Sequence, residues 1–364
     1  MDPTDQGVRY AERIAEVYRD AELRILERIT AALSAGLAAP DWEVQVLGRL
    51  QGLREQVLAI LQGVNAEQAE AIREALAAVY GQAGLGVLAE VGVAATAAEV
   101  ATDARALATS AIAGEMVGAV SSALGPVLRA SEDVLRGVVA EVVAQRTTNA
   151  IGRREATQLA LQRLAAQGLR AVQTRRGVMD LPTYVEMAVR TGTQSAAVAG
   201  HLDQAKAIGL NLVAVQPGPR ACRICDRWAR MVLAIDGPAG TIQARNARTG
   251  ATMEVRVDST VADARAAGWK HPNCRCSIRT YQPGLTRASD LERPAWDAEA
   301  YRAQQRQRGI ERQIRGWKQR EAIAITPEAK REARERIRAW QATMRDHLAQ
   351  HDYLKRQSRR EQLA

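Results

Sequence analysis

The chain has 364 residues and a formal net charge of +9, it contains no Phe, and aromatic residues make up only 4% of it. This length exceeds that of a single typical hydrophobic core and predicts two or three domains. Ala, Val and Leu supply most of the apolar content, and such side chains suit close packing between helices better than the interior of a β-sandwich. We therefore expect a mainly α protein and exclude an all-β fold.

The excess positive charge is concentrated at the C-terminal end. Residues 285–364 carry 19 Lys and Arg against 12 Asp and Glu, which accounts for most of the excess. A basic tail favours contact with an acidic partner such as nucleic acid, although a solvated basic surface has the same composition. Both interpretations stay open at the level of the sequence.

The first residues carry no pattern typical of a secretory signal, because the polar run Met1–Arg9 leads directly into an amphipathic helix. The Ala/Gly-rich segment 81–127 comes closest to a membrane span. Charged residues, among them Glu90, Asp103 and Glu115, interrupt it, so it holds no run of about 18 uncharged residues. We expect a soluble intracellular product without a membrane partner.

Residues 1–178 are expected to form a helical N-terminal region. Apolar residues recur at helical spacing from residue 4 to about residue 33. Further helices are predicted over residues 41–61, 66–80, 97–114, 117–147 and 153–173, with Asp41 and Asn65 as N-caps and an interruption at Gly81, Gly84 and Gly86. The small residues of segment 81–127 indicate either tightly packed helices or a weakly ordered stretch.

Residues 179–284 change character from helix to short strands and turns. Asp180 followed by Pro182 is typical of a helix start, and Gly209 is typical of the end of that helix. Short apolar runs predict strands at residues 211–215, 231–235, 251–257 and 276–281, with a hairpin turn at Thr249 and Gly250. This part is expected to be a small α+β module.

Residues 285–364 are expected to form a basic, charged, helical tail. Helices are predicted over residues 296–324 and from Pro327 to the end, the second one opened by Thr326 as N-cap. The basic side chains that we select as candidates for contact with nucleic acid or a protein partner are Arg306, Arg308, Arg312, Arg315, Lys318 and Arg320.

All four cysteines fall into two close pairs. Two residues separate Cys222 from Cys225 and one separates Cys274 from Cys276, with 48 residues between the pairs. Two thiolate pairs can complete the tetrahedral shell of one zinc ion, and a closed shell of four ligands leaves no position for a catalytic water. We predict a structural Zn²⁺ ion that stabilises the α+β module through these four ligands, with His271 as the alternative fourth ligand.

Four polar residues near the cysteines are predicted to support the metal. Asp226 and Asp236 can orient the ligands through hydrogen bonds. Arg223 and Arg275 lie inside the two cysteine pairs, where a cation offsets the charge of four thiolates around one divalent ion. Solvation at the protein surface is the alternative for all four side chains.

A wider pattern accompanies the cysteines. It consists of the Cys222–Cys225 pair, Asp236-Gly237, His271-Pro-Asn-Cys-Arg-Cys276, Arg190-Thr191 before the first pair, and the tail run 301–318 followed by Trp340-Gln341. This pattern resembles that of phage head morphogenesis proteins of the Mu F-like type and, more closely, that of the phage minor capsid protein 2 family. The resemblance covers roughly residues 180–350. In that family the position of Cys276 holds Cys or His, so the resemblance favours Cys276 as the fourth ligand.

The resemblance implies a low-copy component of a tailed-phage or prophage head, encoded beside the portal and needed for correct head assembly. We accordingly expect a minor capsid protein with a structural role at the portal or the inner capsid shell. Its partners would be the portal protein, the major capsid protein or both. It would be assembled in the host cytoplasm and reside in the capsid interior of the virion. The alternative function is a zinc-containing DNA-binding protein of the packaged head.

Motifs for catalysis are missing from the sequence. It has no His-Glu-x-x-His, no Gly-rich phosphate loop and no His/Glu companion for a catalytic zinc. We therefore expect no catalytic residue, no enzyme activity and no small-molecule substrate. A DNA-reading zinc finger is also disfavoured, because the residues between the cysteine pairs include Asp226, Asp236, Glu254 and Asp258.

Overall fold

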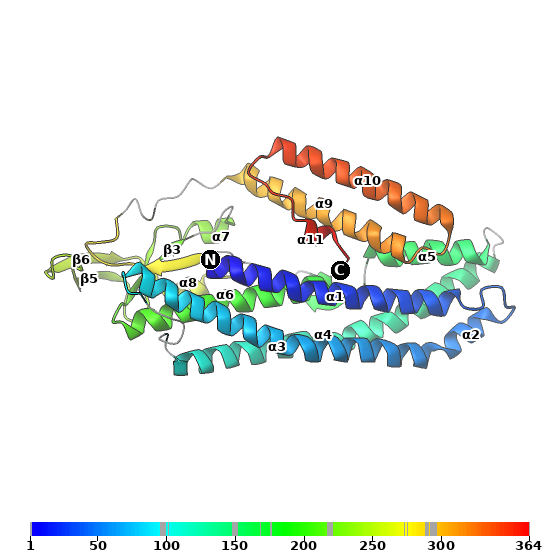
Figure 1. The fold of residues 1–364 in the computed structure, drawn as a ribbon, viewed down its shortest axis with the longest axis horizontal. Coiled ribbons are helices and arrows are strands. Elements are labelled where there is room, and N and C mark those ends of the chain that lie inside the picture. The colour runs from blue at the N-terminus through cyan, green and yellow to red at the C-terminus, as the bar shows by residue number, and fades with distance from the viewer. Residues whose placement is uncertain are drawn as a thin grey trace. The chain divides into compact units, whose positions relative to one another are not determined.

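The computed structural model describes residues 2–94, 100, 102–147, 152–167, 169–174, 177–216, 221–272, 274, 276–287, 291 and 297–363. The chain divides into two compact units, each assembled from distant segments. Unit 1 consists of residues 1–11, 70–117 and 187–301, and unit 2 of residues 12–69, 118–186 and 302–364. The fold is mainly helical, as expected, with a few small sheets (Figure 1).

Long helices dominate the first half of the chain (Figure 1). They are α1 (Pro3–Ser34), α2 (Trp42–Gly48), α3 (Leu50–Glu90), α4 (Thr102–Thr147) and α5 (Arg153–Gln167). Helices are confirmed here, but two predicted interruptions are wrong, because α3 continues through Asn65 and Gly81 and α4 continues through Gly114. Asp41 precedes α2 as predicted, although its side chain makes no capping hydrogen bond.

Close helix contacts in unit 1 explain why glycines do not break α3. A Cβ atom at Gly84 would lie 2.6 Å from Cγ1 of Val100, so the residue must be small for these segments to approach. A Cβ atom at Gly200 of α6 (Leu181–Ala207) would collide with the backbone carbonyl of Tyr80 in α3. The side chain of Tyr80 also donates a 2.7 Å hydrogen bond to Asp203 of α6. At the end of α3, small residues therefore indicate tight packing.

A β-hairpin replaces the end of a helix that was predicted to reach residue 173. β1 (Arg170–Thr174) pairs antiparallel with β2 (Gly177–Asp180). Just before β1, the backbone N–H of Leu169 donates to the buried carboxyl of Glu22 at 2.9 Å, so this N–H is satisfied outside the helical ladder. Asp180 then caps α6 as predicted, since its carboxyl accepts a 2.8 Å hydrogen bond from the N–H of Thr183.

A four-stranded sheet in unit 1 contains three of the four strands predicted in the middle segment. Its strands, in the order β7-β4-β3-β8, are β7 (Ser259–Thr260), β4 (Val232–Ala234), β3 (Leu212–Gln216) and β8 (Ser277–Thr280). β5 (Gly240–Arg245) and β6 (Thr252–Val257) form a separate antiparallel hairpin. The short helices are α7 (Arg223–Asp226) and α8 (Val261–Ala266). The sequence analysis identified β3, β4, β6 and β8 and the hairpin turn before β6, gave no range for β5, and missed β7 and α8.

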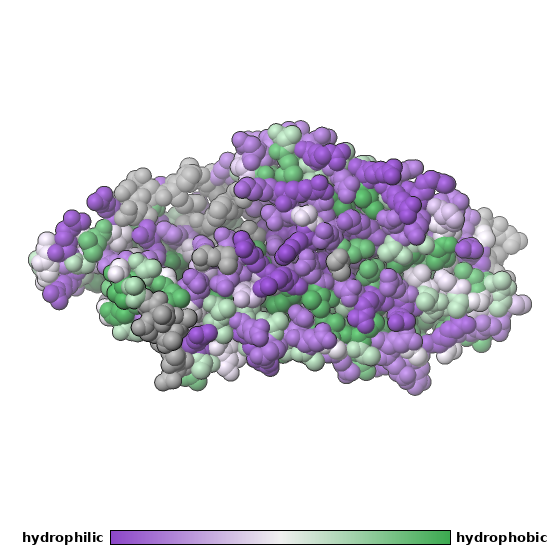
Figure 2. Space-filling view, viewed as in Figure 1, coloured by the Kyte–Doolittle hydropathy of each residue, from purple (hydrophilic) through white to green (hydrophobic). Residues whose placement is uncertain are grey.

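α9 (Ala298–Ala322) and α10 (Pro327–Gln350) lie side by side (Figure 1), and from residue 302 on they belong to unit 2. Ile310, Ile314 and Met344 form a buried cluster that joins them. Thr326 caps α10 as predicted, because its hydroxyl accepts a hydrogen bond from the N–H of Ala329. Hydrophilic residues cover most of the surface over these two helices (Figure 2).

The last residues do not continue α10, so the prediction of a helix to the end of the chain is wrong. The short helix α11 (Ser358–Glu361) places Arg360 against two carboxylates. Arg360 donates to Glu12 of α1 at 2.6 Å and lies 3.9 Å from Glu311 of α9. Glu361 is itself buried and accepts two hydrogen bonds from Arg356. Charge-assisted contacts to these carboxylates hold the folded-back end in place.

Among the described residues, one helix is long and apolar enough to cross a membrane by length and composition alone. It is segment 105–144 of α4, and 33% of its tested apolar window is buried within the protein. Because the core helix of a soluble protein passes the same test, this single helix is weak evidence for a membrane span.

A buried carboxyl group lies in the interior of unit 2. Glu22 of α1 is 6% exposed and accepts hydrogen bonds from the N–H of Leu169 and, at 3.3 Å, from the side-chain amide of Gln319. Burial, together with nearby Asp180, raises the pKa of Glu22 from 4.5 to about 7. Between these two values the folded protein keeps a proton on Glu22 that the unfolded chain releases.

Replacing Glu22 by Gln is expected to stabilise the protein at neutral pH. The wild-type free energy of unfolding falls as pH rises from 4.5 to about 7, because ionisation is easier in the unfolded chain, and this contribution is constant above that range. The neutral amide retains both contacts, since the amide of Gln319 can turn to accept a hydrogen bond. Melting temperatures measured across this range should diverge in favour of the variant. Parallel pH profiles for the two proteins would contradict the assignment.

Candidate metal centre

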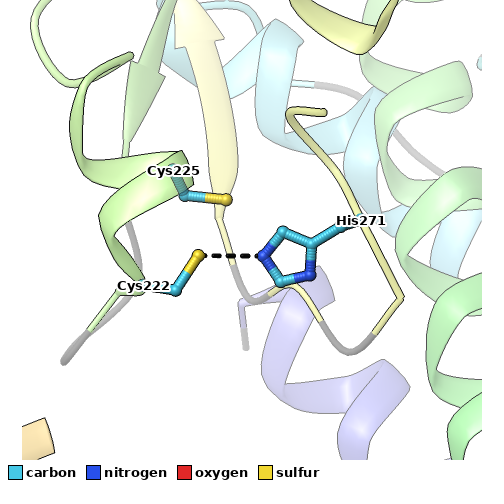
Figure 3. Close-up of side chains that lie close together, drawn as sticks. All are labelled: Cys222, Cys225 and His271. Carbon is cyan, nitrogen blue, oxygen red and sulfur yellow. Dashed lines mark hydrogen bonds between the residues drawn. The ribbon is translucent and has the colours of Figure 1, made fainter. Parts of the chain in front are cut away.

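The first cysteine pair lies on a short helical turn that follows β3. Cys222 has an extended backbone and immediately precedes α7, and its carbonyl accepts a 2.9 Å hydrogen bond from the N–H of Asp226. This turn directs the thiols of Cys222 and Cys225 toward the same space (Figure 3). Cys225 is buried, whereas Cys222 is half-buried.

A second turn, just before β8, presents His271, Cys274 and Cys276. It begins at Lys270, a non-glycine residue with a φ of 63°, which is a strained backbone conformation for a lysine. The N–H of Cys274 then donates a 3.0 Å hydrogen bond to the carbonyl of His271. The end of β3 pairs with the start of β8, so the two turns meet at one end of the sheet.

A hydrophobic cluster encloses the thiols. Its buried members include Cys225, Cys274 and Cys276 together with the side chains of Val213, Val215, Trp228, Leu233, Val261, Trp269 and Ile278. These side chains come from the sheet and from the segments that connect it. They shield Cys225, Cys274 and Cys276 from water, and an isolated negative charge in such surroundings is costly.

The candidate ligand atoms approach one another closely. Cys222 Sγ lies 3.0 Å from His271 Nε2 (Figure 3), and Cys225 Sγ lies 3.4 Å from Cys274 Sγ. His271 Nδ1 lies 2.8 Å from the carbonyl oxygen of Pro272. A proton on Nδ1 satisfies this contact and leaves the lone pair of Nε2 directed at the thiols, which is the usual arrangement of a metal-binding histidine.

The ligand atoms form two groups that share Cys225. One group is Cys222, Cys225 and His271, the other is Cys225, Cys274 and Cys276, and within each group all ligand atoms lie within 4.8 Å of one another. Sulfur ligands of a tetrahedral zinc ion lie about 3.8 Å apart, because the Zn–S bond is about 2.3 Å long. The sulfurs of Cys225 and Cys274, 3.4 Å apart, need to move by only a few tenths of an ångström, so these residues could hold a metal ion.

Electrostatics in the cluster favour a thiolate at some cysteines and a thiol at others. Hydrogen bonds from the thiols of Cys225 and Cys276 lower the pKa of Cys274, and the charge of Lys270 adds to this effect. Hydrogen bonds to Cys274 and Cys276, with burial, raise the pKa of Cys225. Without a bound cation, the cluster therefore keeps some of its sulfurs protonated. A bound metal ion would allow every ligating cysteine to lose its proton, because metal-bound cysteines are deprotonated.

Lys270 is a buried cation beside the cysteine cluster that the sequence analysis missed. Its ammonium group donates to the carbonyl of Cys276 and, at 3.2 Å, to the side chain of Gln194. Burial lowers the pKa of Lys270, and the charges of Cys274 and Cys276 oppose that lowering. The position of Lys270 directly before His271 could have identified it as a cation near the thiols. Only Arg223 and Arg275, inside the cysteine pairs, were predicted in that role.

The residues predicted to support the metal differ in position. Asp226 closes the turn of the first cysteine pair through its backbone N–H. Asp236 forms an ion pair with Lys206 at 2.8 Å, and its backbone makes two hydrogen bonds with the side chain of Asn211. These contacts lie just beyond the end of β4 and involve none of the cysteines. Arg223 is exposed. Arg275 lies outside the described residues.

The six basic candidates of the tail all lie on α9. Arg306 and Arg312 are exposed, and Arg308 and Lys318 are half-buried. Arg315 donates to the carbonyl of Arg360 at 3.2 Å, so it helps to hold the folded-back C-terminus. Arg320 stacks on Trp317, with 4.0 Å between its guanidinium carbon and the ring centroid.

Fold and site together define a mainly helical protein in which a small sheet carries a cysteine and histidine cluster able to hold a metal ion. The family model described as Phage minor capsid protein 2 matches residues 5–349. The chain therefore belongs to the phage minor capsid protein 2 family, which confirms the resemblance inferred from its middle and C-terminal segments and extends it to the N-terminal helices. No curated protein and no solved structure matches the chain.

Membership of this family makes the chain a phage minor capsid protein. It is accordingly associated with the virion and interacts with other virion proteins. The family is structural, which fits a protein that is not an enzyme.

Replacing Lys270 by Met is expected to weaken metal binding by about tenfold or more, a typical effect of removing a group that supports metal ligands. The variant loses the cation next to Cys274 and Cys276 and keeps the length of the side chain. Competition with a chromophoric chelator measures the affinity for Zn²⁺. Lys206→Met is the matched control, because Lys206 pairs with the exposed Asp236 at 2.8 Å. Equal affinities in the two variants would show that Lys270 has no such role.

Proposed function

We propose that this protein acts structurally in head assembly, at the portal or the inner surface of the capsid, and that a zinc ion closes its central module. The family match over residues 5–349 carries the proposal. The portal protein, the major capsid protein or both would be its partners. Assembly would take place in the host cytoplasm, and the protein would reside in the capsid interior.

The proposed zinc site uses Cys222, Cys225 and Cys274, with Cys276 or His271 as the fourth ligand. The donor set supports this choice, since thiolate and imidazole both suit zinc. His271 Nε2 lies 3.0 Å from Cys222 Sγ, whereas Cys276 groups with Cys225 and Cys274, so each candidate has a contact in its favour. Structural zinc contributes on the order of 10 kcal/mol to folding, which a small module needs.

We also propose that the module of residues 179–284 acts as one rigid element between the helical region 1–178 and the tail 285–364. The pairing of β3 with β8 supports this view, because it joins the segments that carry the two cysteine pairs. In this arrangement Asp226 supports the first turn, Lys270 offsets the charge of the thiolates, and Arg223 and Arg275 add positive charge near them, whereas Asp236 pairs with Lys206.

A second candidate function is DNA binding in the packaged head. One observation favours it: two guanidinium groups lie near the ring of Trp317, those of Arg320 at 4.0 Å and Arg336 at 5.7 Å from the ring centroid. Paired arginines beside an aromatic ring suit contact with a phosphate backbone. Filter binding of duplex DNA by the wild type and by Arg320→Glu/Arg336→Glu distinguishes this function, and no difference between them would exclude this surface.

The purified protein is expected to contain one zinc ion per chain when prepared under reducing conditions without chelator. Elemental mass spectrometry measures the metal, and near-ultraviolet circular dichroism follows the packing of Trp228 and Trp269 beside the cysteines. Cys222→Ser should lose zinc and this signal together. Protein that is folded and free of zinc would refute the metal site without affecting the family assignment.

The zinc content of two further variants identifies the fourth ligand. If Cys276 binds the metal, Cys276→Ser loses stoichiometric zinc while His271→Asn retains it. If His271 binds the metal, the two results are exchanged. Zinc retained in both variants would show that neither side chain is required.

Phage particles that lack this protein are expected to show defective heads, because a structural minor component is needed for correct assembly. Electron microscopy of a deletion strain, complemented with wild type or with Cys222→Ser/Cys225→Ser, tests the role and its dependence on the cysteine cluster. Crosslinking mass spectrometry of complete heads then identifies the contact as portal or major capsid protein. Normal infectious heads in the deletion strain would refute a role in assembly.

A further inference from the structure

A cavity of about 250 Å³ lies in unit 1, at the N-terminal end of α1. Residues of α1, α3, α6, β3 and β8 line it together with Lys270, and none of the five candidate metal ligands is among them. Its apolar walls include Ala83, Ala197, Val198 and Ile278. A cavity that combines apolar walls with a few polar groups is typical of a site for a small ligand.

Polar side chains without a partner also line the cavity. His201 of α6 is 6% exposed, and its Nε2 atom has no hydrogen-bond partner among the described residues. Burial lowers the pKa of His201 to about 4, so the ring is neutral at pH 7. Gln216 and Ser277 are paired residues of β3 and β8, and both contribute to the lining. Because buried polar groups are normally hydrogen-bonded, a ligand with polar groups would suit this cavity.

Two carboxylates belong to the lining, those of Asp2 and Glu90. Asp2 accepts a 2.7 Å hydrogen bond from the N–H of Thr4, and Glu90 accepts two from Thr280. Within the described chain, no Lys or Arg forms an ion pair with either carboxylate. Partial burial raises the pKa of Glu90, and the contacts of Thr280 and the charge of Arg279 only oppose this effect. A cation in the cavity would stabilise the ionised carboxylates.

The positive charge of Lys270 is directed mainly away from these carboxylates. Its ammonium group donates to the side chain of Gln194 and to the carbonyl of Cys276, on the side of the cysteine cluster. Since His201 is neutral, the lining carries two negative charges and one positive charge. Charge complementarity therefore favours a cationic ligand over an anionic one.

We propose that this cavity binds an organic cation, namely an alkyl chain that ends in an ammonium or guanidinium group. The cationic group would contact Glu90 and Asp2, and the alkyl chain would lie against the apolar walls. Free amines and the Lys or Arg side chains of another virion protein share this chemistry. The site depends neither on the zinc ion nor on a role in head assembly, and the cation is a bound ligand rather than a substrate.

The first experiment is calorimetric titration of the purified full chain at low ionic strength. Agmatine, which carries an ammonium and a guanidinium group on a short alkyl chain, should bind saturably with one site per chain. Hexanoate, a carboxylate of similar length, should not bind. The blocked peptide acetyl-Gly-Arg-Gly-amide distinguishes the two sources of the cation. Binding of the peptide as well would support a side chain of a protein partner, and binding of agmatine alone would support a free amine.

Gly86→Leu is expected to weaken agmatine binding by roughly tenfold or more, because the new side chain occupies the cavity. Gly86 lines the cavity, and a Cβ atom there would meet no neighbour within 4 Å, so the folded chain should accept the change. Leucine also has a higher helix propensity than glycine. Gly63→Leu is the matched control, since Gly63 lies in the same helix, has equally open surroundings and does not line the cavity.

Glu90→Gln tests the charge, and about tenfold weaker binding is expected because one carboxylate is neutralised. The amide oxygen can still accept hydrogen bonds from Thr280, so the fold should be retained, and circular dichroism checks this. Glu67→Gln is the matched control at an exposed position of α3. Three results would overturn the proposal: no saturable binding of agmatine, equal affinity in the wild type and Gly86→Leu, or tighter binding of hexanoate than of agmatine.

Discussion

The central module depends on how a cluster of sulfur atoms is held in a place from which water is excluded. Cys225, Cys274 and Cys276 are all buried, and they come from two turns separated by about fifty residues. Negative charge on several of these sulfurs requires a cation close by, and Lys270 can supply only one positive charge. A divalent ion in the same space would join the two turns and leave each thiolate with a partner.

In unit 2, buried carboxyl groups are accommodated in two different ways. Glu12 and Glu311 come from helices at opposite ends of the chain, and Arg360 lies against both of them. Within the part of the chain that the structure describes, Glu22 forms no ion pair, and burial keeps a proton on it up to about pH 7. Both solutions avoid an unpaired buried carboxylate. Among the described helices, α1, α3, α4, α6 and α9 contribute residues to both units.

Much of the fold could be predicted from the sequence because it follows from local rules. Asp180 and Thr326 cap the helices that they were predicted to open. The extent of the long helices could not be predicted in this way. Gly84 was predicted to interrupt a helix, yet it lies inside α3, and a larger residue there would collide with Val100. Whether a glycine breaks a helix or permits a contact depends on a neighbour that the local sequence does not contain.

For the candidate site, the sequence alone determined the residue types, the spacing of the cysteines and the membership of a family of structural phage proteins. Only the tertiary structure decided which side chains meet. It placed His271 3.0 Å from Cys222, brought Lys270 to the carbonyl of Cys276, and left Asp236 with Lys206. The reason is that spacing along the chain limits only contacts within one turn. Contacts between turns depend on the register of β3 against β8, which the packing of the whole sheet determines.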